Sequence, residues 1–211
     1  MNNRGSMAIT GVILITSIIL IGATAASLLG TQSEDTSEED LIDLYNQVVD
    51  ETIDEITTYL QITDKLGKYY GDPHQQIIEK IAIMVKPLIS TDIDISGLTI
   101  KLCDGNTVKI LNFGENAEFI GSQSLFGHSL WDTLPEGTFG VIVTHDEDKS
   151  LVNYNAINKN TDMAYIVIKL SEEFALKKGD VLVVTLFPES GIQKTIKLEA
   201  PLPMRSIISF E

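Results

Sequence analysis

The chain is poor in cysteine, with Cys103 as its one thiol in 211 residues. A single thiol cannot form a disulfide within the chain, so a disulfide-stapled scaffold is excluded, although export from the cell is not. A small thiol side chain in apolar surroundings is more often packed than reactive. We therefore expect Cys103 to be a buried small hydrophobic residue.

Basic residues are also scarce, because 15 Lys and Arg stand against 30 Asp and Glu, for a net charge of −15. Binding to nucleic acid needs basic patches that displace counterions from phosphates. A nucleic-acid partner is therefore excluded. An acidic surface fits solubility, mutual spacing of molecules or a salty exterior.

Charge is missing altogether from Ser6 to Ser33. About 20 apolar residues in helical form span a membrane, so this stretch is long enough. Its leader, residues 1–5, holds a single basic side chain, Arg4. An ordinary signal peptide is cut after its apolar region, whereas the candidate site here, between Gly5 and Ser6, precedes it. Cutting there would leave the apolar helix on the mature protein, which suits a subunit that waits in a membrane and then polymerises.

Proline and glycine are absent from Thr31 to Leu66. Apolar residues from 38 to about 60 recur at helical spacing with acidic residues between them, which predicts an amphipathic helix. One long rod over residues 6–66 is therefore allowed. Small residues in the apolar stretch permit close packing with copies of itself, and a single-pass anchor that packs against nothing is the alternative.

From about Ile77 the pattern changes to short apolar strands separated by turn residues. The strand segments are 77–78, 81–85, 98–102, 108–112, 139–143, 164–170, 181–187 and 195–198. Seven or more short strands without helices between them predict an antiparallel β-sandwich over residues 72–211. Residues 114–130 are interpreted as a longer loop or an edge excursion. The predicted fold class is α+β, with a long N-terminal helix before the sandwich.

Catalytic motifs such as GxSxG, HExxH or a phosphate-binding loop are missing, so no sequence feature supports an enzyme. The one dense cluster of ligand-type residues follows His145. There Asp146, Glu147 and Asp148 could hold Ca²⁺ or Mg²⁺, and a solvated hairpin turn is the alternative interpretation. The isolated histidines, His74 and His128, are expected at the surface, and Trp131 is expected in a core or an interface.

Three segments together resemble the archaeal flagellins, or archaellins. They are the apolar run SMAITGVILITSIILIGATAASLLGTQ behind Arg4-Gly5, the stretch IIEKIAIMVKPLISTDIDISGLTIKL, and the hairpin LKKGDVLVVTLFPESGIQKTIKLEAPLP. The resemblance covers most of the chain and leaves residues 114–130 unmatched.

The resemblance implies a filament subunit of the archaellum, the swimming organelle of archaea. A prepilin peptidase would remove residues 1–5, with Arg4 and Gly5 before the cut and Ser6 after it. Helix 6–66 would form the filament core and an immunoglobulin-like sandwich, residues 72–211, the outer sheath. The partners would be copies of the chain or paralogous archaellins, and a membrane motor and assembly complex. The precursor would sit in the cell membrane and the product in an extracellular filament.

Three features depart from the family pattern. The third mature position is Ala8, where many relatives have Gly, and the fifth is Thr10 rather than the Glu common in bacterial-type pilins. The chain also has no Asn-x-Ser/Thr sequon, although related filaments are often N-glycosylated. Two alternatives remain at this point: an adhesive archaeal pilin, and a single-pass accessory protein with an extracellular β-domain.

Overall fold

The computed structural model describes Ile42, Gln47, Val48 and residues 60–71, 76–90, 92–189, 192–201 and 205–210. The chain divides into two compact units, Met1–Asp54 and Glu55–Glu211. In the first unit, the three described residues are helical. The predicted leader with Arg4, Gly5 and Ser6, and most of the predicted helix, lie outside the described residues. Within the described residues, no helix has the length and apolar character needed to cross a membrane.

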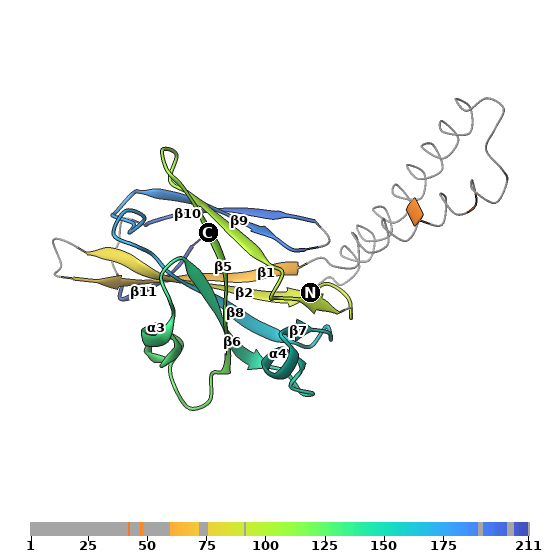
Figure 1. Ribbon diagram of the computed structural model, residues 1–211. Coiled ribbons are helices and arrows are strands. Elements are labelled where there is room, and N and C mark those ends of the chain that lie inside the picture. Colours follow the sequence, from red (N-terminus) through yellow and green to blue (C-terminus); the bar gives the residue numbers. More distant parts are fainter. Residues whose placement is uncertain are drawn as a thin grey trace, which may run out of the picture. The chain divides into compact units, whose positions relative to one another are not determined.

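The second unit is built mostly of β-strands (Figure 1). Its strands are β1 (Leu60–Tyr70), β2 (Ile77–Pro87), β3 (Ile93–Asp94), β4 (Thr99–Cys103), β5 (Val108–Phe119), β6 (Thr138–His145), β7 (Ala156–Ile157), β8 (Met163–Lys169), β9 (Val181–Phe187), β10 (Lys194–Glu199) and β11 (Ile207–Ser209). Three short helical segments lie between strands: η1 (Leu125–Gly127), α3 (Leu130–Thr133) and α4 (Ser150–Tyr154). Every strand segment predicted from Ile77 onward overlaps one of these strands, and only Leu98 and Leu170 lie one residue outside.

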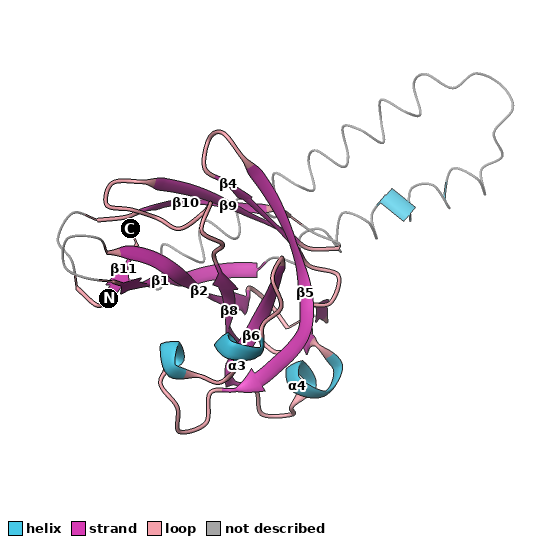
Figure 2. Cartoon of the chain, turned by 60° about the vertical axis from the view of Figure 1, so that its left-hand side comes forward, coloured by secondary structure: helices cyan, strands magenta, loops and turns pink. Residues whose placement is uncertain are grey.

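Nine of the strands form one sheet in the order β10-β9-β4-β5-β6-β8-β2-β1-β11, and β3 pairs separately with β7. The sheet curls, so that β10, β9 and β4 lie over β1, β2 and β8, with the long strand β5 joining the two layers (Figures 1 and 2). The main hydrophobic core fills the space between the layers, with side chains from both, among them Ile83, Ile100, Ile166 and Val184.

One pair of strands departs from the antiparallel sheet that the sequence predicted. Strands β5 and β6 run parallel, with Asn112 opposite Thr138 and Phe119 opposite Val143. Parallel neighbours need a crossover, because a tight hairpin reverses the chain. Residues 120–137 supply it, since they carry the chain from the end of β5 back beside its middle. The stretch interpreted as a loop is therefore partly strand and partly crossover.

The predicted helix boundary at residue 66 was wrong, because residues 60–66 belong to β1. Strand β1 pairs with β2 over its length and with β11 over Leu66–Lys68. Its first residue, Leu60, is buried in the main core. The pairing with β2 and β11 fixes this segment, and such long-range pairing overrides local helical spacing. The β-domain thus begins before residue 72.

The two chain ends of the β-domain meet at one edge of the sheet. Phe210, just after β11, donates its backbone N–H to the carbonyl of Lys65. Its ring lies against Gly67, where an added Cβ would come within 2.9 Å of the ring. Glycine is needed at this point of β1, because any side chain would push the Phe210 ring away.

Candidate functional site

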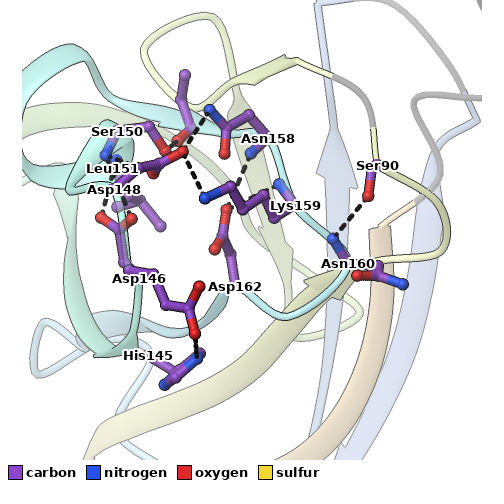
Figure 3. Close-up of polar contacts among 12 residues, drawn as sticks. Ser90, His145, Asp146, Asp148, Ser150, Leu151, Asn158, Lys159, Asn160 and Asp162 are labelled. Carbon is purple, nitrogen blue, oxygen red and sulfur yellow. Dashed lines mark hydrogen bonds and ion pairs between the residues drawn. The ribbon is translucent and has the colours of Figure 1, made fainter.

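The acidic loop after β6 brings two of its three predicted ligands together. Asp146 is 7% exposed, and its two carboxylate oxygens accept the backbone N–H groups of Ser150 at 3.2 Å and Leu151 at 3.0 Å. Asp148 also accepts the Ser150 N–H, at 3.1 Å. Both carboxylates therefore bind the unpaired N–H groups at the start of α4, as acidic residues do at helix N-termini (Figure 3).

A lysine neutralises the second of these carboxylates. Lys159 Nζ lies 3.1 Å from Asp148 Oδ2, and Asn158 Nδ2 donates to the same oxygen at 3.2 Å. The Lys159 ammonium is the main cause that holds the pKa of Asp148 well below its usual range. Burial has the opposite effect on Asp146, whose pKa is raised, with the nearby Asp148 and Asp162 carboxylates adding to the shift.

A third carboxylate, which the sequence did not single out, completes this network. Asp162 is fully buried, and its Oδ2 accepts the backbone N–H groups of Asn158 at 3.1 Å and Lys159 at 2.9 Å. Its Oδ1 and the side-chain oxygen of Asn158 are both buried without a hydrogen-bond partner among the described residues. Figure 3 shows the Lys159 side chain in contact with Asp148, with the Asp162 side chain nearby. The network ties residues 146–151 to residues 158–162.

Glu147 takes no part in that network. Its side chain is 66% exposed, and its Oε1 lies 3.8 Å from His145 Nε2. In the described part of the chain, no three His, Cys, Asp or Glu side chains are arranged to hold one metal ion. The structure thus brings Asp146 and Asp148 together, leaves Glu147 apart, and puts the ammonium group of Lys159 beside Asp148.

The crossover after β5 covers one outer face of the sheet. Its side chains form a second hydrophobic cluster with the outward residues of β2, β6 and β8, namely Ala82, Ile142 and Val167. Trp131 is fully buried there, stacks on Phe126 at 5.8 Å between ring centroids, and donates its indole N–H to the Leu125 carbonyl at 2.7 Å. We call the outward side of β6, β8 and β2 the covered face.

His128 holds this cover in place and corrects a prediction, because it is 2% exposed rather than at the surface. Its Nδ1 accepts the backbone N–H of Leu130 at 3.2 Å, and its Nε2 lies 3.0 Å from the carbonyl of Phe119. These two bonds join the end of β5 to the start of α3. Local sequence gave no signal for this burial, since the partners are backbone groups.

Lys80 marks the rim of the covered face. Its ammonium lies 5.1 Å from the ring centre of Trp131 and 5.5 Å from that of Tyr70. Burial lowers the pKa of Lys80 and raises the pKa of Tyr70. The aliphatic part of the lysine therefore packs at the edge of the covered face, and its ammonium makes two cation–π contacts there.

The other half of the sheet has an outer face that no described segment covers. We call it the bare face: the outward side of β4, β9, β10 and the first part of β5. Val108 and Ile110 are 56% and 50% exposed there. Cys103 lies in the same face and is partly exposed, so the prediction of a buried thiol was wrong. Neither hydrophobic cluster includes these side chains.

A hollow of about 700 Å³ is lined by residues of β2, β5 and β8 and of the loops around Pro135 and Glu172. Its charged lining consists of Glu79, Glu136, Glu172, Glu173, Lys109 and Lys169. One of the lysines, Lys109, is bound to Glu136 at 3.1 Å. The lining has no His, Cys or Asp, and its one hydroxyl, Ser171, lies 3.5 Å from Lys109 Nζ. The hollow is therefore lined mainly by charged side chains, four of which are carboxylates.

A comparison with known protein families found one family that matches most of the chain. The sequence profile described as archaeal-type flagellin matches residues 5–198, which takes in the apolar segment and nearly all of the β-domain. The chain belongs to the archaeal-type flagellin family. The family is structural rather than enzymatic.

Two curated archaeal flagellins resemble the chain along most of its length. Flagellin B3 of Methanocaldococcus jannaschii is 24% identical over 207 residues, which cover 95% of this chain and 92% of the relative. Flagellin B3 of Thermococcus kodakarensis is 22% identical over 225 residues, which cover 93% and 85%.

Solved structures of archaeal flagellins share the fold. The crystal structure of flagellin FlaB1 from Methanocaldococcus jannaschii matches with a TM-score of 0.63 at 24% identity, over 72% of this chain and 95% of that one. The archaeal flagellum of Methanospirillum hungatei matches with a TM-score of 0.50 at 12% identity, over 91% and 92%. The curled sheet is therefore a flagellin β-domain.

Proposed function

We infer that this flagellin is the structural subunit of an archaeal flagellar filament used for swimming. The observation that carries the inference is the family match, which spans residues 5–198. Such filaments are cell-surface appendages built from flagellin copies.

Electron microscopy of filaments sheared from the source cells, with peptide identification of their subunit, tests this function. Deleting the gene should abolish swimming. If deletion abolished adhesion and left swimming intact, the chain would be a pilin instead.

We propose that the chain from Ser6 up to the start of β1 at Leu60 polymerises as the filament core. The uncharged stretch from Ser6 to Ser33 is longer than a domain of this size needs for its own core. In water a lone copy would aggregate, whereas a bundle of helices hides the apolar surface. The β-domain would be the outer sheath, and its two facing layers support a sandwich of the immunoglobulin kind.

We propose that a prepilin peptidase cuts the precursor between Gly5 and Ser6 in the membrane, and that a motor and assembly complex then takes up the subunit. Arg4 supports this order, because a charge is costly in an apolar packed core and favours the cytoplasmic side of a membrane. The mature chain should begin Ser6-Met7-Ala8 in N-terminal sequencing of sheared filaments.

The variant Gly5→Val should crowd the peptidase site and leave full-length precursor in the membrane. Immunoblotting of membrane and filament fractions measures this. A Gly5→Val strain that swims normally would contradict the proposed processing.

A Ca²⁺ or Mg²⁺ ion at Asp146, Glu147 and Asp148 stays a prediction. The buried oxygens of Asp162 and Asn158 that lack hydrogen-bond partners support it, and the Lys159 ammonium beside Asp148 weighs against it. Calorimetric titration of the protein with CaCl₂ would check it.

A further inference from the structure

The bare face presents apolar side chains side by side on neighbouring strands. Val108 on β5 pairs with Cys103 on β4, and Cys103 pairs with Val183 on β9. Paired residues of adjacent strands project to the same side of a sheet, so the three side chains form one row. Ile110 stands two residues from Val108 and extends the apolar area along β5.

The open apolar side chains of the bare face contrast with the covered face of the same sheet. The outward residues of β6, β8 and β2 are sealed by the crossover, so that Ile142 and Val167 are fully buried. The outward Val108 and Ile110 stay half exposed. Contiguous apolar area that a protein leaves open commonly marks an interaction site.

The charges of the bare face indicate what can approach it. Its outward charged residues are Lys101, Lys197 and Glu199, and Lys197 is bound to Glu199 at 3.3 Å. Lys101 has no carboxylate within ion-pair distance among the described residues. The face is therefore net positive in a chain with a net charge of −15. Copies of this chain carry the same net negative charge and repel one another, so a locally positive apolar face favours the approach of an acidic surface.

We propose that the bare face binds a second copy of this chain in the filament, against an acidic surface of the neighbouring β-domain. The proposal rests on the filament function, which supplies copies at close range. The contact joins two different surfaces, because head-to-tail contacts of that kind generate helical filaments whereas self-complementary ones close into dimers. The apolar row excludes water, and Lys101, which lies opposite Ile110 on the next strand, pairs with a carboxylate of the neighbour.

Cys103 offers a direct measurement on the unaltered protein, because it lies in the middle of the apolar row. Sheared, washed filaments and subunits dissociated in detergent are treated with N-ethylmaleimide, and the rate of labelling at Cys103 is followed by mass spectrometry. We expect labelling at least tenfold slower in filaments than in subunits. Equal rates in the two states would overturn the proposal while leaving the filament function intact.

Other occupants of the face give different results. Slow labelling in dissociated subunits as well would mean that the chain's own N-terminal segment covers the face. Protection on cells that is lost in washed filaments would mean a different surface partner. Either result overturns the proposal, and a chain that forms no filaments at all overturns both it and the filament function.

A matched pair of variants tests the same contact without the thiol. Ile110→Asp places a charge beside the apolar row, and Ile207→Asp places one at an isoleucine of similar exposure, 48%, on β11. We expect at least tenfold less filament per cell for Ile110→Asp, and an unchanged amount for Ile207→Asp, as measured by quantitative immunoblot of sheared fractions. Equal yields from the two variants would contradict the assignment of the face.

Discussion

The two halves of the curled sheet differ in their outer faces, because one face is covered by another segment and the other is open. In one half the crossover between β5 and β6 lays Phe126, Leu130 and Trp131 over the outward side chains of three strands. In the other half, β4, β9 and β10 and the start of β5 keep theirs open, with Ile110 at 50% exposure. Both halves bury their inner sides in the same core.

The difference suggests that one half of the sheet stabilises the domain and the other half is available for contacts. The middle parts of β2, β6 and β8 are buried on both sides, which is why residues 81–83, 141–143 and 166–168 are continuous apolar runs. They form the stable centre of the domain. The bare half alternates buried and open residues, and its open residues cost little stability, so their sequence is free to serve contacts with other molecules.

Removing β1 should have the largest effect, because it takes a strand from the covered half and leaves the bare half whole. A fragment of residues 55–211 should be a soluble monomer that unfolds in one cooperative step. A fragment of residues 72–211 should fail to fold, since it lacks Leu60 and Tyr69 from the core and leaves β2 unpaired along one edge. Gel filtration and urea denaturation followed by circular dichroism measure both. Equal urea midpoints for the two fragments would show that β1 is dispensable.

Truncating Trp131 should have the next largest effect on stability. It compares the covered face with the bare face in a domain that still folds. Trp131→Ala in the fragment 55–211 should lower the free energy of unfolding by about 3–5 kcal/mol, as expected for a fully buried aromatic residue. Val183→Ala on the bare face is the matched change, and it should cost about 1 kcal/mol or less, as at other open positions. Urea denaturation gives both values. Similar losses for the two variants would mean that the halves do not differ in stability.

The smallest expected effect concerns alkaline pH, because the two halves differ in tyrosine. Tyr70 and Tyr165 border the covered face, and burial is the main cause that raises the pKa of each above the usual 10.0. Strands β4, β5, β9 and β10 contain no tyrosine. An acid whose pKa is raised by folding binds its proton more tightly in the folded state, so stability falls as the pH rises from 10.0 towards the raised value.

The variant Tyr165→Phe should therefore lose less stability than the wild-type protein between pH 9 and pH 11. Thermal unfolding across that range measures the difference. Tyr154→Phe is the matched control, because it removes the same hydroxyl from a tyrosine that is 77% exposed. Parallel curves for Tyr165→Phe and the wild type would remove the role assigned to burial.

Strands with a plain apolar pattern were predictable from the sequence. Strand β9, for example, has the predicted limits, Val181 and Phe187, because turn residues lie on both sides of its apolar run. Strand β1 could not be predicted, since Leu60 continues the helical spacing of the residues before it and only pairing with β2 and β11 reveals a strand. The second part of β5 was missed because Gly114 and Glu115 interrupt the pattern, and Glu115 has a φ of 57°.

The carboxylates of the acidic loop were predicted from the sequence, where they are neighbours, but the residues that bind them were not. Asp162 and Lys159 reach Asp148 and Asp146 only after the chain has turned through α4 and β7. The bare face was not predicted either, because alternation in a single strand does not say whether another segment will cover its outward side.

The meeting of β1 and β11 at one edge has a mechanical consequence. In the filament proposed above, drag on the β-domain is passed along the chain through Leu60, the first residue of β1. Strand β1 is hydrogen-bonded to β2 along its length and to β11 on its other side, and Phe210 lies across Gly67. A pull along β1 therefore loads many backbone hydrogen bonds at once, in shear, rather than opening them one by one. Strand β11, paired with β1 at its outer edge, helps to keep β1 in the sheet when it is under tension.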